Sequence, residues 1–159
     1  SIHGGILGGT ITLLYFSKKY KINFLKLTDL FSVPLALALA FGRLANFINQ
    51  ELVGTPTDSV LGITFPLHDD IKRWPYQIFA SLKNMATFQI LFFLQEFKNL
   101  KTGTLTSLFL ILYSIGRFII DFLREPTTDL GLISMGQLLS LIYAAAGIIL
   151  LFRVNKKTQ

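Results

Sequence analysis

Polar side chains that could bind an anion occupy the last turns of an apolar run, in the stretch FGRLANFINQELVGTPTD at 41–58. Five of them are candidates: Arg43, Asn46, Asn49, Gln50 and Glu51. An arginine at the centre of a membrane helix costs about 2.5–3.5 kcal/mol, so it normally faces the interior of a bundle. Asn46 and Gln50 follow Arg43 by three and seven residues, so in a helix they share its face. The stretch therefore predicts a polar face centred on one guanidinium group.

A second polar stripe follows the spacing i, i+4, i+8 and i+11 and consists of Tyr113, Arg117, Asp121 and Arg124. Arginine binds phosphate oxygens with two parallel hydrogen bonds and keeps its proton. Two arginine-centred stripes in an apolar chain therefore suit a phosphate group that enters from lipid. A simpler interpretation stays open, because Asp121 lies four residues after Arg117 and could neutralise it. Likewise Asn46 could cap a helix end, and Arg124 could reach the membrane surface.

Histidine and lysine side chains add three further groups. His3 precedes two glycines, which allow close approach of the backbone, and it is either a catalytic group or a packed side chain. His68 lies in a polar loop and receives no role. Lys83 lies inside an apolar segment and could reach the surface or pair with Asp29 or Glu96. Since the chain has no cysteine and only two separated histidines, we expect no metal site and no cofactor. Any thiol chemistry would use a thiol of the substrate.

The composition indicates a membrane protein. Hydrophobic residues make up 52% of the 159 residues and charged residues 15%, with a mean hydropathy of +0.55. A soluble domain carries about 25% charged residues. The net charge of +6 comes from short basic clusters between apolar runs, which we interpret as topology signals and as attraction to anionic lipids. Nucleic acid is therefore not expected as a partner.

Five apolar segments are expected to form helices, because backbone groups in lipid must bond within their own element. The segments are 4–16, 30–48, 75–97, 104–123 and 132–152. About 20 apolar residues span a bilayer, so four segments qualify and the first is marginal. We predict an all-α, polytopic bundle of about five transmembrane helices, forming a single transmembrane domain over 1–159.

Basic residues give the orientation of this bundle. Nine of the 15 fall on one side by alternation: Lys18, Lys19, Lys21, Lys26, Lys98, Lys101, Arg153, Lys156 and Lys157. The positive-inside rule makes that side cytoplasmic. The 49–74 loop then faces outward and is long enough to form a small cap on the membrane surface. We expect a multi-pass protein of the plasma (inner) membrane, with its site toward the outer face.

Four motifs resemble the prolipoprotein diacylglyceryl transferase family. GRLANFINQELVG at 42–54 resembles the family signature Gly-Arg-x-Gly/Ala-Asn-Phe-x-Asn-x-Glu-x-x-Gly. HGG at 3–5, YSIGRFIIDFLREP at 113–126 and ISMGQLLSL at 133–141 resemble other family segments. The four occur in the family's order and cover nearly the whole chain, and the stretch at 42–54 is the most specific.

The resemblance implies an integral membrane enzyme that moves a diacylglyceryl group from phosphatidylglycerol to the lipobox cysteine of a prolipoprotein signal peptide. A thioether forms and glycerol phosphate leaves, in the first step of bacterial lipoprotein maturation. The expected catalytic residues are His3, Arg43, Tyr113 and Arg117. The expected substrate-binding residues are Asn46, Asn49, Glu51, Gly54, Asp121 and Arg124.

The chemistry of that reaction fits the residues. Negative charge grows on the leaving phosphate, so fixed cations aimed at it lower the barrier. The attacking thiol has a pKa near 8.5 and must lose its proton, for which a histidine is suited.

The chain also departs from the family pattern. The segment WPYQIFA at 74–80 replaces His-Pro-Ser-Gln-Leu-Tyr-Glu, and Asp121 stands where a glutamate is usual. Family members carry further helices before the His-Gly-Gly motif, so we expect the chain, which begins at Ser1, to be the C-terminal portion of the family fold. A catalytically impaired relative that acts as a membrane binding or scaffold module is therefore an alternative. An anion transporter is a third, but the paired interrupted helices of inverted-repeat carriers are not visible.

Overall fold

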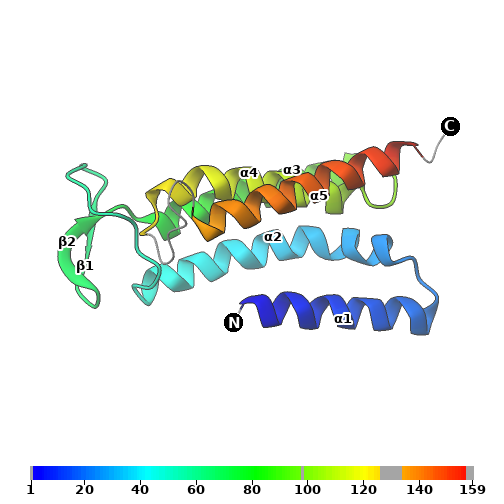
Figure 1. The fold of residues 1–159 in the computed structure, drawn as a ribbon, viewed down its shortest axis with the longest axis horizontal. Helices are drawn as coiled ribbons and strands as arrows, with labels where there is room; N and C mark the ends of the chain where they lie inside the picture. Colours follow the sequence, from blue (N-terminus) through cyan, green and yellow to red (C-terminus); the bar gives the residue numbers. More distant parts are fainter. Residues whose placement is uncertain (1, 98, 126–133, 157–159) are drawn as a thin grey trace.

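Helices that run side by side make up most of the computed structural model, which describes residues 2–97, 99–125 and 134–156, without the side chains of 2–4, 6, 7 and 97 (Figure 1). The described elements are α1 (Ile2–Tyr20), α2 (Phe24–Ile48), β1 (Ile63–Phe65), β2 (Asp69–Arg73), α3 (Tyr76–Phe97), α4 (Thr104–Ile120), the 3₁₀ turn η1 (Asp121–Leu123) and α5 (Met135–Lys156). The prediction of a polytopic helical membrane protein is confirmed. Within the described ranges, three helical segments are long and apolar enough to cross a membrane: α2, α4 continued through η1, and α5.

The expected all-α class is wrong in the 49–74 loop. There β1 and β2 form an antiparallel hairpin, with Ile63 opposite Arg73 and Phe65 opposite Asp69. A loop outside the bilayer can satisfy its backbone groups by strand pairing or by water, so it is free of the constraint that makes spanning segments helical. The hairpin lies at one end of the bundle, beyond the end of α2 and the start of α3 (Figure 1).

Apolar and polar side chains are distributed as expected of a bundle surrounded by lipid. Buried polar residues lie between the helices: Ser32, Gln77, Ser81, Asn84, Thr87, Ser107, Ser114 and Ser140. One of them, Ser81, donates a hydrogen bond of 2.9 Å to the carbonyl oxygen of Ala40 and so joins α3 to α2. Large apolar side chains such as Phe41, Ile119 and Phe152 are instead exposed. Small polar residues at helix contacts and large apolar residues outside are typical of membrane helices.

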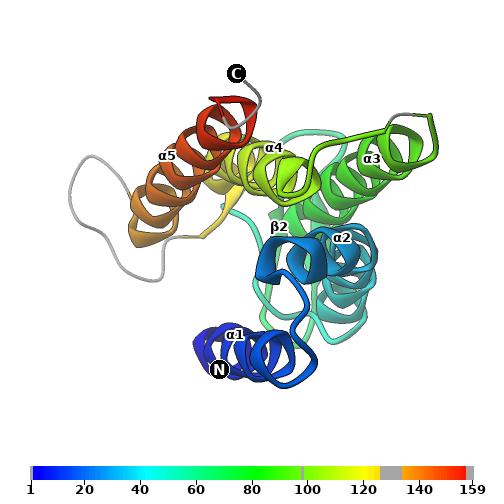
Figure 2. The ribbon, with the colours of Figure 1, turned by 90° about the vertical axis from the view of Figure 1, so that its right-hand side faces the viewer.

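The helix α4 is central to the packing. Figure 2 shows α4 between α5 on one side and α2 and α3 on the other, while α1 contacts α2. An apolar core joins α2, α3 and α4 through Val33, Ala36, Leu91, Leu105 and Phe109. Since α2 and α4 carry the two predicted arginine stripes, this packing brings the stripes together.

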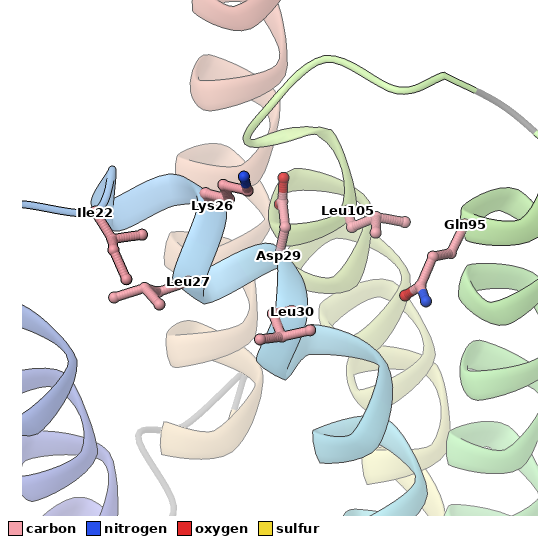
Figure 3. A pocket seen from close by; sticks show the side chains of 7 residues that line it. All are labelled: Ile22, Lys26, Leu27, Asp29, Leu30, Gln95 and Leu105. Atoms are coloured by element: carbon pink, nitrogen blue, oxygen red, sulfur yellow. The ribbon is translucent and has the colours of Figure 1, made fainter. Parts of the chain in front are cut away.

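The start of α4 is held by a carboxylate from another helix. Gly103 precedes α4 and supplies no side-chain cap. Asp29 of α2 takes that role, because its carboxylate accepts hydrogen bonds from the backbone N–H of Gly103 at 2.5 Å and of Thr106 at 2.8 Å. A carboxylate at a helix N-terminus satisfies free N–H groups and complements the helix dipole. Asp29, Leu30 and Leu105 also line an open cavity of about 410 Å³ at this end of the bundle (Figure 3).

Basic residues collect at the same end. Lys18 and Lys19 lie in the last turn of α1, and Arg153 and Lys156 in the last turn of α5. These helix ends lie opposite the hairpin (Figure 1). The alternation that assigned basic residues to one side therefore agrees with the described fold.

Candidate active site

Three arginines, one from α2 and two from α4 and the segment after it, act electrostatically on one buried tyrosine. Tyr76 begins α3 and is only 2% exposed. Its hydroxyl interacts electrostatically with Arg43 of α2, Arg117 of α4 and Arg124, which follows η1. The guanidinium carbon of Arg124 lies 6.0 Å from the centre of the Tyr76 ring. We call Arg43, Arg117 and Arg124 the arginine cluster. The structure therefore unites the two predicted stripes at the hairpin end of the bundle.

The cluster has unused hydrogen-bond donors. Arg117 donates from Nη1 to the Tyr113 hydroxyl at 3.4 Å, but its Nε is buried without a hydrogen-bond partner. The Nε of Arg124 is buried and unpartnered in the same way. Within the described part of the chain, Arg43 forms neither a hydrogen bond nor an ion pair. Buried donors normally have partners, and charged donors are the costliest to leave without one. Arg117 and Arg124 therefore each have a hydrogen-bond donor that no described residue uses.

Asp121 acts electrostatically on Tyr76 together with the arginine cluster, and it is 7% exposed. Its Oδ2 accepts a hydrogen bond of 2.5 Å from the hydroxyl of Ser134. Gly136 of α5 makes room for it, since a Cβ there would lie 2.7 Å from Oδ2 of Asp121 and 3.3 Å from Nη2 of Arg117. The ion pairs of the described residues all lie in the hairpin region, and none joins Arg117 to Asp121.

Asp121 forms its hydrogen bond with a residue other than Arg117. The i, i+4 spacing had left open that Asp121 neutralises Arg117. Helix α4 ends at Ile120 and Asp121 opens the 3₁₀ turn η1, although the Asp121 backbone N–H still donates to the carbonyl oxygen of Arg117. The Asp121 side chain accepts its hydrogen bond from Ser134, which precedes α5. Asp121 still acts on Arg117 electrostatically, so the interpretation that Asp121 neutralises Arg117 stays open.

The polar residues after Arg43 connect α2 to its neighbours. Asn46 donates from Nδ2 to Oε2 of Glu51 at 3.0 Å. The carbonyl oxygen of Glu51 accepts a bond of 2.7 Å from Gln77 of α3, whose side chain is fully buried. Gln50 accepts a bond of 2.8 Å from the backbone N–H of Leu67 in the hairpin. These bonds fix the end of α2, and with it Arg43, against α3 and the hairpin.

Asn49 and Gly54 lie on this segment in different environments. Asn49 is exposed and ends α2 as its C-cap, with its backbone N–H bonded to the carbonyl oxygen of Ala45. Gly54 is buried, pairs with Arg124 in a β-bridge and donates its N–H to the carbonyl oxygen of Trp74 at 3.2 Å. Gly54 therefore holds the strand-like backbone beside Arg124 in place. That either residue binds substrate stays a prediction.

Substitution of Gly54 by alanine is expected to lower the thermal stability of the protein. A Cβ at this position would lie 2.4 Å from the carbonyl oxygen of Trp74 and 2.7 Å from that of Leu123. Backbone atoms cannot move aside as a flexible side chain can, so overpacking should cost about 1–3 kcal/mol. Thermal unfolding in detergent measures the effect, and Gly42→Ala is the matched control because nothing lies within 4 Å of a Cβ at Gly42. Equal unfolding temperatures for the two variants would contradict the prediction.

A cluster of charged side chains ties the hairpin to the segment after η1. Arg73 is 5% exposed and donates to Asp69, to the carbonyl oxygen of Gly54 at 3.1 Å and to Glu125 at 3.0 Å. His68 Nε2 lies 3.3 Å from Oε2 of Glu125. The hydrogen bond from Arg73 lowers the pKa of Asp69 below its usual value. The cluster therefore contributes stability at neutral pH, and that contribution is lost as the pH falls through the lowered pKa of Asp69. Because Glu125 follows Arg124, this contact also positions the arginine cluster.

Comparison with known proteins identifies the family. A family model described as prolipoprotein diacylglyceryl transferase matches residues 1–153. The chain belongs to the prolipoprotein diacylglyceryl transferase family. The resemblance found in the four motifs is thereby confirmed.

Individual relatives within the diacylglyceryl transferase family match almost the whole chain. A phosphatidylglycerol–prolipoprotein diacylglyceryl transferase from Campylobacter curvus is 40% identical over 98% of this chain and 58% of its own length. The protein of the same name from Polynucleobacter asymbioticus is 41% identical over 99% of this chain and 62% of its own length. That from Chlorobaculum tepidum is 42% identical over 93% of this chain and 53% of its own length. The chain thus spans less than two thirds of the length of these transferases.

The side chain of one predicted catalytic residue is not described by the structure. His3 belongs to α1, but its side chain is not among those that the structure describes. Pro126 and Ile133, at the ends of two family motifs, also lie outside the described residues. The assignment of His3 as a catalytic residue stays a prediction.

Sequence reasoning missed two residues of the candidate transferase site. Tyr76 lies among the three arginines, and Gln77 holds the carbonyl oxygen of Glu51. Both follow Pro75 at the start of the third apolar segment. The available signal was the presence of polar residues in the first turn of an expected membrane helix. That turn lies at the same end of the bundle as the two arginine stripes.

Proposed function

We propose that the protein transfers a diacylglyceryl group from phosphatidylglycerol to the lipobox cysteine of a prolipoprotein. The observation that carries this function is the arginine cluster: three guanidinium groups around Tyr76, two of them with buried, unpartnered Nε atoms. A phosphate group can accept from several guanidinium groups at once through bidentate bonds. The names of the relatives contain phosphatidylglycerol and prolipoprotein, which we take as the two substrates. The hydrogen-bond donors of the arginine cluster agree with a lipid phosphate as the bound anion.

The proposed reaction is a displacement at the glyceryl carbon that carries the phosphate. The cysteine thiol gives its proton to a base, for which His3 is the candidate, and the sulfur forms a bond to that carbon. The carbon–oxygen bond breaks, and its electron pair goes to the phosphate oxygen of the departing glycerol phosphate. Charge on the phosphate grows by one unit in this step. Arg43 and Arg117 stabilise the growing charge, while Tyr113 orients Arg117 and is available to the substrate.

We further propose that all five helices cross the plasma membrane as one transmembrane domain, with the hairpin and the arginine cluster at the outer face. The basic ends of α1 and α5 support this orientation, since they lie opposite the hairpin (Figure 1). An outer location places the cluster where a lipoprotein signal peptide presents its cysteine after export.

Cysteine labelling tests the proposed orientation. Tyr20→Cys and Asp70→Cys should react from opposite sides of the membrane with an impermeant thiol reagent, because both residues are exposed and lie at opposite ends of the bundle. The chain has no cysteine of its own, so the unaltered protein is the control for background labelling. Labelling of both positions from the same side would overturn the outward site.

Transfer itself is tested with purified protein, phosphatidylglycerol and a lipobox peptide. Mass spectrometry should show the peptide with a diacylglyceryl thioether, and glycerol phosphate should appear in equal amount. A peptide whose cysteine is replaced by serine is the control. The alternative, a binding or scaffold module, has support in the partial coverage of the relatives and in Trp74, Phe79 and Ala80 of the altered segment. Binding of phosphatidylglycerol without transfer would favour this alternative.

A further inference from the structure

One cation of the site belongs to neither predicted stripe. Lys83 follows Tyr76 by seven residues on α3, so the two share a face two turns apart. The Lys83 ammonium lies 3.9 Å from the centre of the Tyr113 ring, and its stem packs against Gly116 of α4, where a Cβ would lie 2.4 Å from Cδ of Lys83. The side chain therefore faces the interior of the bundle, beside the tyrosine that contacts Arg117.

Lys83 has no compensating carboxylate in the described part of the chain. None of the ion pairs of the described residues includes it, and neither Asp29 nor Glu96, which the sequence left open as partners, is among the groups that act on it. The charged groups that act on it are Arg43 and Arg117, both of the same sign. An aromatic ring attracts a cation but leaves its charge in place. Ionisable side chains inside a membrane protein are costly, and an unpaired one indicates a functional role.

The charged groups around Lys83 indicate which kind of anion this part of the site favours. Arg43, Arg117 and Arg124 act on Tyr76, Arg43 and Arg117 also act on Lys83, and Asp121 is the one carboxylate among the groups that act on these two residues. Basic groups therefore outnumber acidic groups here. A phosphodiester such as a lipid phosphate carries one negative charge, whereas a free phosphate monoester carries about 1.5 to 2 near pH 7. The anion with more negative charge gains more from this surplus of basic groups, so the monoester product is favoured over the diester substrate.

We propose that Lys83 is a further phosphate-binding cation of this site, which binds the leaving glycerol phosphate more strongly than the phosphatidylglycerol from which it comes. The inference rests on the proposed function. As the carbon–oxygen bond breaks and its electron pair moves to the phosphate oxygen, the group gains one negative charge, and the Lys83 ammonium meets that charge. A contact that strengthens as the reaction proceeds raises the turnover rate without tightening substrate binding.

The test is Lys83→Met, which keeps a stem of similar length against Gly116 and removes the charge. Glycerol phosphate binding, measured by calorimetry on the purified protein in detergent, should weaken about tenfold, the lower range for a hydrogen bond to a charged group. Turnover with phosphatidylglycerol should fall about 10²-fold, as when one donor to a developing anion is removed. The KM for phosphatidylglycerol should stay unchanged, and Lys83→Arg should retain most glycerol phosphate binding.

Two controls separate this role from a structural one. Lys101→Met removes the same charge at the basic end of the bundle, where Lys101 is exposed, and should change neither quantity. Thermal unfolding of each variant reports the integrity of the fold. Unchanged glycerol phosphate binding in a folded Lys83→Met protein would overturn the proposal, as would a lack of binding by the unaltered protein. Because this measurement needs no turnover, loss of the transferase proposal and loss of the Lys83 proposal remain distinguishable.

Discussion

Arg117→Ala is expected to lower the turnover rate about 10²–10³-fold, the usual cost of losing one donor to a developing oxyanion. Arg117 lies in the arginine cluster, donates to Tyr113 and keeps a buried Nε without a partner. Its bond to the phosphate strengthens as the leaving group gains charge, so the loss should appear in kcat more than in KM. Activity per folded molecule in detergent, with phosphatidylglycerol and a lipobox peptide, is the measurement.

Changes at Asp121 separate catalysis from folding. Asp121→Asn should cost less than Arg117→Ala, because it alters the hydrogen bond to Ser134 and leaves the guanidinium charge in place. If Arg117 and Asp121 were only a structural pair, the double change Arg117→Leu/Asp121→Leu would restore both fold and activity. A folded, inactive double variant supports the pocket, whereas a folded, active one would remove Arg117 from it.

Arg43→Lys is expected to abolish most activity although it conserves charge. Lysine carries a point charge and cannot form the two parallel bonds of a guanidinium group with phosphate. Arg43 is placed by the bonds that follow it, from Asn46 to Glu51 and from Gln77 to the Glu51 carbonyl oxygen, so its geometry rather than its charge alone is specified. The same activity assay measures the effect.

The matched control for Arg43→Lys is Arg153→Lys, in the last turn of α5 at the basic end. It makes the same chemical change far from the arginine cluster and should leave activity unaltered. Normal turnover by Arg43→Lys would mean that Arg43 serves only as a structural charge.

The hydrophobic pattern of the sequence predicted where the helices lie, but it predicted neither their exact ends nor the hairpin. The expected segment at 75–97 agrees closely with α3, Tyr76–Phe97, because Pro75 marks its start. The segment at 4–16 was too short, since α1 continues to Tyr20 through Lys18 and Lys19, whose charges end an apolar run but do not break a helix. Strand β2, DDIKR, has no apolar alternation, and tertiary contacts of Arg73 hold it instead.

The site was predictable as two arginine stripes but not as a set of contacts. Spacing placed Arg43 and Arg117 on inward faces, and the structure brings both to Tyr76. Spacing could not show that Asp121 accepts a hydrogen bond from Ser134, which lies 13 residues further along the chain. The position of Lys83 depends on the space that Gly116 leaves on another helix. Such contacts between distant segments are not encoded in the periodicity of one helix.

The carboxylate of Asp29 sets a condition on how the nascent chain assembles. Its partners Gly103 and Thr106 lie 74 and 77 residues later, so α2 is synthesised well before they exist. At a translation rate of 5–20 residues per second, this delay is roughly 4–15 s. During that interval water at the membrane surface must solvate Asp29, because the bonds that later occupy it have not been made. When α4 is inserted, its free N–H groups replace this water at Asp29, and the bonds then hold the start of α4 against α2.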